Sequence, residues 1–100
     1  MLIALDYDNT WTKSPVLWAQ IVSLFKSHGH NFICVTSRAD TIDNRRQLNE
    51  SIGVLMPIIY CNHTPKKKQA KQAGFKPDIW IDDRPETIPT HVRQWKVTNH

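Results

Sequence analysis

The sequence predicts an α/β domain with a small parallel sheet of four or five strands. Two observations lead to this prediction. Short apolar runs alternate along the chain with longer amphipathic stretches. Each amphipathic stretch is long enough for one helix between two strands. Such alternation is typical of right-handed β-α-β units, in which helices connect the strands of a parallel sheet.

Four apolar runs are the predicted strands. They are short and apolar on both faces, as expected of strands buried in a parallel sheet. A run at residues 95–97 adds a candidate fifth strand. The four main runs cover residues 2–5, 32–35, 57–61 and 79–81.

Three helices are predicted between these runs. The first begins at Ser14 and Pro15, which suit the N-cap and the first helical position. It ends before Gly29, because glycine readily adopts the left-handed conformation that closes a helix. By the same signals, the second helix begins at Asp40 or Thr41 and ends at Gly53, and the third begins at Thr64-Pro65 and ends at Gly74.

Length and composition describe one domain over residues 1–100, since a domain usually takes about 100–200 residues. The net charge of +4 permits a polyanionic partner without requiring one. The apolar runs are too short to cross a bilayer, so we expect no membrane association. We read no secretion signal at the N-terminus, and two cysteines are too few for a disulfide framework. A cytoplasmic protein with reduced thiols is therefore expected.

Acidic and hydroxyl residues follow the predicted strands. Asp6 follows the first, Thr36 ends the second, and Asp82 and Asp83 follow the fourth. In open α/β sheets the carboxyl ends of the strands line the ligand crevice. We therefore expect these side chains to converge, although they are far apart in the sequence.

The same residues resemble the motifs of the haloacid dehalogenase (HAD) superfamily. The first motif, an apolar strand followed by Asp-x-Asp-x-Thr, matches Asp-Tyr-Asp-Asn-Thr at residues 6–10. The strand ending in Thr36 is similar to the second motif, a lysine among residues 66–68 to the third, and Asp-Asp at 82–83 to the fourth. The resemblance covers about residues 2–86. It implies a three-layer, Rossmann-like HAD core, and a short capless phosphatase of the kind found in phages and bacteria.

The resemblance also implies a chemistry. A Mg²⁺-dependent phosphatase of this kind works through an aspartyl-phosphate, with Asp6 as nucleophile and Asp8 as general acid and base. Mg²⁺ prefers a few carboxylates together with waters and phosphate oxygens. The implied ligands are the carboxylates of Asp6 and Asp83 and the main-chain carbonyl of Asp8.

The remaining catalytic roles fall to a hydroxyl and a lysine. Thr36 is expected to hydrogen-bond a phosphoryl oxygen, although strand-end hydroxyls often bind backbone instead. A lysine would neutralise phosphoryl charge. Lys67 is the first choice, and Lys66 is the close second and a candidate substrate-binding residue. Asp82 is expected to orient the lysine rather than bind metal.

Several residues beside these motifs have two readings each. The Thr-Ser-Arg sequence that ends at Arg38 resembles a motif of polynucleotide 3′-phosphatase domains, in which the arginine contacts substrate phosphate. A surface arginine at the strand end is the equal alternative. Ser37 is either a second substrate-binding hydroxyl or a loop hydroxyl. Trp11 either packs at the base of its loop or stacks on substrate. Thr10 is expected to brace the turn that carries Asp8.

The spacing of the motifs leaves no room for a cap domain. Asp6 and Thr36 are 30 positions apart, and Thr36 and Lys67 are 31 apart. An uncapped site suits a nucleotide, a nucleic-acid end or another large phosphorylated substrate, or needs a partner subunit as a lid. An exposed sheet edge also makes a homodimer an expectation. The alternative function is a non-catalytic HAD-fold module that binds nucleic acid or protein.

Overall fold

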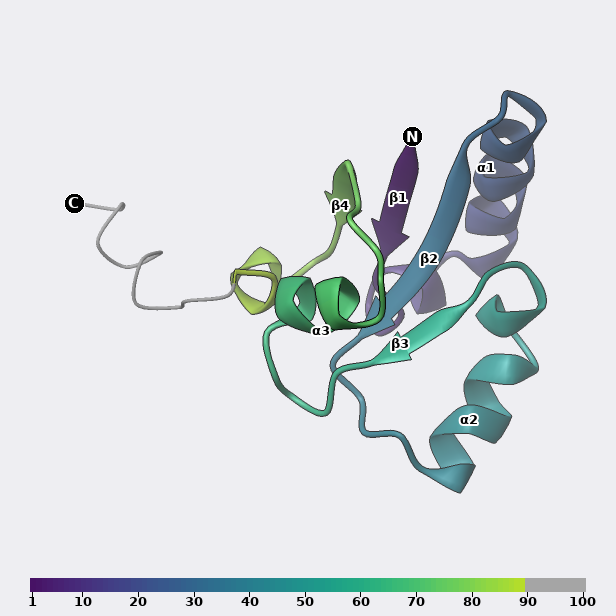
Figure 1. Cartoon of the computed structure of the whole chain (residues 1–100). Coiled ribbons are helices and arrows are strands. Elements are labelled where there is room, and N and C mark those ends of the chain that lie inside the picture. Colours follow the sequence, from purple (N-terminus) through teal and green to yellow (C-terminus); the bar gives the residue numbers. More distant parts are fainter. Residues whose placement is uncertain (90–100) are drawn as a thin grey trace.

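A four-stranded parallel sheet forms the centre of the molecule (Figure 1). The computed structural model describes residues 1–89, so the candidate strand at 95–97 lies outside the described residues. All four main apolar runs form strands, which confirms the predicted α/β class. In sheet order the strands are β3 (Ile58–Tyr60), β2 (Asn31–Thr36), β1 (Leu2–Leu5) and β4 (Ile79–Ile81).

The strand order creates a crevice beside β1. The chain proceeds outward from β1 through β2 to β3 and then returns to place β4 on the other side of β1. Ala4 on β1 is accordingly paired with Ile33 on β2 and with Trp80 on β4. In doubly wound sheets, ligands bind at the point where the strand order reverses. The residues that follow β1 and β4 flank that point here.

The first two helices begin at the predicted residues, whereas the third begins at Lys66, one residue after Pro65, and has no side-chain cap from Thr64. Pro15 is the first residue of α1, and the Thr41 side chain caps α2 by accepting a hydrogen bond from the backbone N of Asn44 at 3.1 Å. The second helix ends at Asn49, earlier than the predicted stop at Gly53. Gly53 instead lies within a short 3-10 helix that follows. The helices are α1 (Pro15–Ser27), α2 (Ile42–Asn49) and α3 (Lys66–Gln72), and the 3-10 helices are η1 (Trp11–Lys13), η2 (Ile52–Val54) and η3 (Pro85–Thr87).

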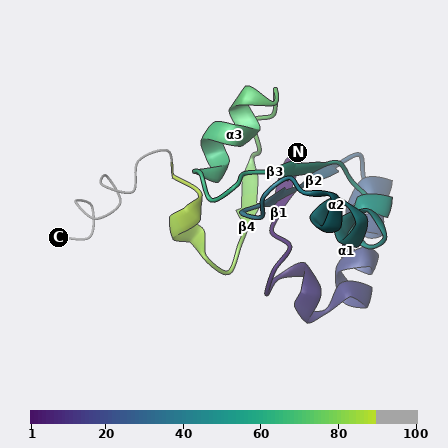
Figure 2. The same cartoon turned by 90° about the horizontal axis from the view of Figure 1, so that it is seen from below.

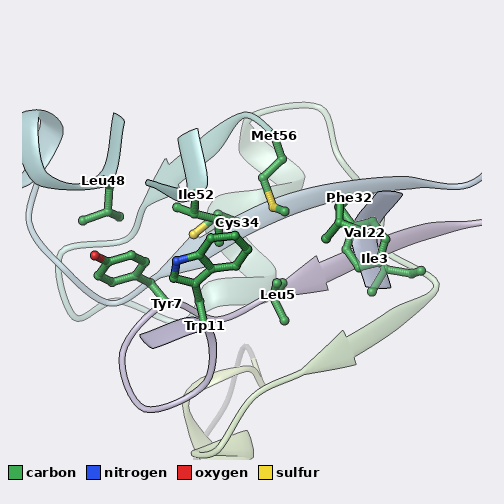
Figure 3. Close-up of a cluster of buried hydrophobic side chains, with 10 residues drawn as sticks. All are labelled: Ile3, Leu5, Tyr7, Trp11, Val22, Phe32, Cys34, Leu48, Ile52 and Met56. Atoms are coloured by element: carbon green, nitrogen blue, oxygen red, sulfur yellow. The ribbon is translucent and has the colours of Figure 1, made fainter. Parts of the chain in front are cut away.

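Helices cover both faces of the sheet, giving three layers (Figure 2). Alternate residues of the central strands supply the two cores, as the period of a strand requires. Residues such as Ile3 and Phe32 pack with Val22 of α1 and Leu48 of α2 (Figure 3). Ala4, Ile33 and Val35 form the core on the α3 side.

This packing decides between the two readings of Trp11. Trp11 is 4% exposed and belongs to the larger core, so the packing reading is confirmed over substrate stacking (Figure 3). Leu17 and Leu24 of α1 remain exposed. The helix packs on the core through the buried Val22 and the partly buried Trp18, Ile21 and Phe25. Within the described residues, no helix is both long and apolar enough to cross a membrane.

Candidate functional site

A cavity of about 490 Å³ lies where β1 and β4 end. Its walls come from the loops after β1, β2 and β3, the start of α3 and the segment from β4 into η3. The helices and strands between Asp6 and Lys66 all belong to the sheet or to the layers packed on it. None of them forms a cap domain over this cavity. Six of the predicted site residues line it: Asp6, Asp8, Ser37, Lys66, Asp82 and Asp83.

Asp6 lies at the base of this site, directly after β1. Its backbone N donates to the carbonyl of Ile81 at 3.0 Å, which extends the pairing of β1 with β4 by one residue. The side chain is only 7% exposed. Burial, which disfavours the charged form, raises the pKa of Asp6 to about 6; the hydrogen bond from Lys66 opposes this rise, and Asp83 adds to it.

Lys66 is the cation of the site. It is the first residue of α3, and its side chain is 2% exposed. Its Nζ donates to Oδ1 of Asp6 at 2.8 Å and to Oδ2 of Asp82 at 2.5 Å. Burial alone lowers the pKa of this ammonium, but the two carboxylates outweigh burial and the net shift is upward. Lys66 therefore stays charged between its two partners.

The structure places the two neighbouring lysines differently, with Lys66 buried beside Asp6 and Lys67 exposed. Lys67 was the first choice as the catalytic lysine, but its side chain is exposed and lies outside the cavity lining. Its backbone N donates to the carbonyl of Ile88 at 3.0 Å. Successive residues of a helix point about 100° apart. Only one of the two lysines can therefore face the sheet, and that residue is Lys66.

Asp82 and Asp83 occupy different positions in the site. The Asp82 side chain is 3% exposed, and its second oxygen accepts a hydrogen bond from the backbone N of Arg84 at 2.9 Å. Asp82 therefore contacts the Lys66 ammonium through one oxygen and the backbone of Arg84 through the other. Asp83 is exposed, and Thr10 Oγ1 lies 3.4 Å from its Oδ1 and 3.3 Å from Oδ2 of Asp6. Thr10 therefore contacts two carboxylates, beyond its expected role in the turn.

The acidic cluster suits a divalent cation. One carboxylate oxygen from each of Asp6, Asp82 and Asp83 lies within 4.8 Å of the others. The cluster places three carboxyl groups beside the single ammonium of Lys66. Hard divalent cations prefer such oxygen ligands. Burial is the largest cause of the raised pKa of Asp6, and the neighbouring Asp83 raises it further.

Asp8 also borders the cavity, but Arg38 holds its carboxylate. Arg38 Nε donates to Oδ2 of Asp8 at 2.9 Å, and Nη2 donates to Oδ1 at 2.8 Å. The carboxylate raises the pKa of the guanidinium. Arg38 itself is not among the residues that line the cavity. In this arrangement the guanidinium of Arg38 contacts Asp8 and does not face the cavity, where a direct contact with substrate was expected.

The two hydroxyls after β2 also differ from expectation. Thr36 is fully buried, and its Oγ1 accepts a hydrogen bond from the backbone N of Arg38 at 3.2 Å. This contact matches the alternative reading, a strand-end hydroxyl bound to backbone, and the contact between Thr36 and a phosphoryl oxygen stays a prediction. Ser37 lines the cavity and is the hydroxyl placed to meet a ligand.

Sequence reasoning missed the loop after β3 as a wall of the cavity. His63 lines the cavity, and its backbone N donates to the carbonyl of Ser37 at 2.9 Å. Asn62 and His63 both have positive φ, 50° and 61°. Asparagine and histidine are enriched in this left-handed region, so the Asn-His pair after the third run is the signal that could have indicated a tight turn.

Comparison of the chain with known protein families, with curated proteins and with solved structures gives no match. The fold and site define a Rossmann-like α/β domain. It carries an acidic cluster, suited to a divalent cation, at the carboxyl edge of its sheet. The functional argument therefore rests on the geometry of that cluster and its neighbours.

Proposed function

We propose that this protein is a Mg²⁺-dependent phosphatase of the HAD type that acts through an aspartyl-phosphate on Asp6. One observation carries the proposal. Asp6, Asp8, Lys66 and Asp83 come from three separate segments and border one cavity. The order of these residues along the chain also resembles the order of the HAD motifs.

Asp6 is the proposed nucleophile. With a pKa of about 6, its carboxyl group is mostly ionised at neutral pH. A carboxylate oxygen attacks phosphorus, the bond from phosphorus to the leaving oxygen breaks, and an aspartyl-phosphate forms on Asp6. Lys66 and Thr10 hold the carboxylate in place, and the ammonium of Lys66 stabilises charge on the phosphoryl oxygens.

Asp8 is the proposed acid and base. It protonates the leaving oxygen in the first step. In the second step it accepts a proton from the water that attacks the aspartyl-phosphate, which releases phosphate and restores Asp6. Tyr7, the residue between them, is buried in the core, so that Asp6 and Asp8 both border the cavity (Figure 3).

Asp6 and Asp83 are the proposed side-chain ligands of Mg²⁺. Asp82 is engaged by Lys66 and by the backbone of Arg84, which favours a supporting role for it. When bound, Mg²⁺ offsets the negative charge that the substrate phosphate brings to these carboxylates.

The proposed substrate is large or extended: a nucleotide, a nucleic-acid end or another phosphorylated macromolecule. No described element covers the cavity as a cap would. Arg84 on the cavity wall is 69% exposed and pairs with Glu86 at 3.1 Å, so a substrate that extends outward would meet this ion pair at the rim. The net charge of +4 favours a polyanionic substrate in the same direction.

A binding module without turnover is the second candidate. The observation that favours it is the run of exposed lysines along α3, at Lys67, Lys68 and Lys71. Such a module would bind nucleic acid through its phosphates, and its affinity would fall steeply with salt.

Phosphate release is the decisive measurement. The purified protein is assayed with p-nitrophenyl phosphate and with 3′- and 5′-phosphorylated oligonucleotides, with Mg²⁺ and with excess EDTA. We expect Mg²⁺-dependent release that Asp6→Asn abolishes. Asp43→Asn on exposed α2 is the matched control and should retain full activity.

Two results would count against the phosphatase. Activity that survives Asp6→Asn excludes Asp6 as the nucleophile. Salt-sensitive binding of the labelled oligonucleotides, with no phosphate released from any substrate, supports the binding module instead.

A further inference from the structure

We infer that Arg38 is a positioning residue for the Asp8 carboxylate and that two side chains of α2, Asn44 and Gln47, fix Arg38 for that task. The inference rests on the proposed function, in which Asp8 is the acid and base. It replaces the reading of Arg38 as a direct contact to substrate phosphate.

The hydrogen-bond donors of Arg38 are almost fully used within the protein. A guanidinium has five N–H groups. Two of them, on Nε and Nη2, donate to Asp8. The two on Nη1 reach Oδ1 of Asn44 at 3.1 Å and Oε1 of Gln47 at 2.8 Å. One N–H group remains, so a substrate phosphate could bind bidentately only by displacing one of these partners.

The location of Arg38 favours the same role. Its guanidinium lies over the ring of Tyr7, with 5.1 Å between Cζ and the ring centroid. Tyr7 itself is 4% exposed, so this face of the guanidinium rests on the core. Asp8 lines the cavity and Arg38 does not. Arg38 therefore contacts Asp8 from outside the cavity lining.

The backbone of Arg38 is held as well. Its N donates to Oγ1 of the buried Thr36 at 3.2 Å, and its carbonyl accepts a hydrogen bond from the N of Asn62 at 3.1 Å. The side chain therefore starts from a fixed point. The Thr36 hydroxyl therefore helps to fix the turn from which Arg38 extends toward Asp8.

Asp8 needs such support because it is otherwise loosely placed. Its side chain is 47% exposed, and it precedes Asn9, whose φ is 61°. The two parallel hydrogen bonds from Arg38 define the plane of the carboxylate. Each oxygen keeps a second lone pair that Arg38 does not use. A proton donor held in place near the leaving oxygen gains the advantage of orientation.

Leaving-group dependence separates positioning from other roles. p-Nitrophenolate leaves readily without a proton, whereas an alkoxide needs the proton from Asp8. The assay therefore compares p-nitrophenyl phosphate with an alkyl phosphate, under Mg²⁺, for Arg38→Ala, Arg38→Lys and the Asn44→Ala/Gln47→Ala double variant. Arg45→Ala is the matched control, because Arg45 also lies on α2 but pairs with Asp40 at the surface.

We expect Arg38→Ala to lower kcat on the alkyl phosphate by about 100-fold, the lower end of what general acid–base catalysis contributes. We expect a loss of less than about tenfold on p-nitrophenyl phosphate and little change in KM. Arg38→Lys should behave similarly, because lysine lacks the planar fork. Adding Arg38→Ala to Asp8→Asn should cause no further loss, since two residues that act as a unit are not additive.

The other outcomes overturn the inference. A rise in KM for both substrates with kcat unchanged would assign Arg38 to substrate binding. An equal loss of kcat on both substrates would indicate a structural role. If Arg38→Ala does not fold, the Asn44→Ala/Gln47→Ala variant must reproduce the leaving-group dependence. A parent protein inactive on both substrates refutes the proposed function and this inference together; an active parent with equal losses refutes this inference alone.

Discussion

Replacing Lys66 with methionine should destabilise the protein far more than the same change at Lys67. Methionine is apolar and close to lysine in length, so the substitution removes mainly the ammonium. At residue 66 that ammonium lies between two carboxylates, with side chains 2%, 7% and 3% exposed for Lys66, Asp6 and Asp82. At residue 67 the side chain is exposed.

The magnitude follows from the two ion pairs. Removing one partner of a buried pair leaves an uncompensated charge and costs about 3–5 kcal/mol. An exposed substitution changes the free energy of unfolding by less than about 0.5 kcal/mol. A domain of this size has about 5–15 kcal/mol in total, so Lys66→Met should lose a large part of its stability.

Urea unfolding followed by tryptophan fluorescence measures both variants, and pH adds a second readout. Because the pKa of Asp6 in the folded protein, about 6, exceeds its ordinary 3.8, the folded state takes up the proton first as the pH falls. The stability from this group is therefore full below pH 3.8 and is lost as the pH rises toward 6. Lys66→Met removes an interaction that lowers this pKa, so its deficit should be larger at pH 7.5 than at pH 5.

Equal free energies of unfolding for Lys66→Met and Lys67→Met would refute the placement of Lys66 between the two carboxylates. A deficit of Lys66→Met that grows as the pH falls would refute the electrostatic reasoning. If Lys66→Met is unfolded at pH 7.5 while Lys67→Met is folded, the comparison at pH 5 still tests the sign.

Three further predictions concern the metal, a helix cap and the core. Mg²⁺ at 100 times its Kd should stabilise the parent by about 2.7 kcal/mol, seen as a higher Tm that EDTA reverses; an equal shift in Asp83→Asn would exclude Asp83 as a ligand. Thr41→Ala should cost about 1 kcal/mol in urea unfolding, because it removes the cap of α2, and no loss would contradict that cap. Val22→Ala should cost about 2 kcal/mol, whereas Leu24→Ala, 58% exposed, should cost little; equal losses would contradict the packing of α1.

The fold was largely predictable because its signals are local. Each strand is a short apolar run bounded by polar residues, and each helix has a start or stop signal within a few positions. The exception is the end of α2. Gly53 marked a stop, but the helix ends at Asn49 and the chain continues into η2, which brings Ile52 into the core. That choice depends on contacts across the molecule.

The candidate site was predictable only as far as strand ends determine it. Asp6, Asp8, Asp82 and Asp83 border the cavity because parallel strands share one carboxyl edge. The choice between two adjacent lysines was not predictable, since it depends on the rotation of α3 about its axis.

The partner of Arg38 was hidden for another reason. Asp8 is 30 positions away, and the acceptors on α2 are specified only once that helix packs against the loop after β2. A guanidinium after a strand fits a substrate phosphate and a carboxylate equally well. The local pattern therefore left both readings open.

The position of β1 between β2 and β4 means that the site is complete only when β4 has joined the sheet. The first strand pairs with the last described strand, and beside them the backbone N of Leu2 donates to Oδ2 of Asp78 at 2.8 Å, across 76 positions. During synthesis, a chain stopped before β4 already contains Asp6, Asp8 and Lys66, but it lacks Asp82 and Asp83. Such a partial chain could neither balance Lys66 with both carboxylates nor assemble the acidic cluster. Metal binding at this cluster would therefore report that β4 has paired with β1.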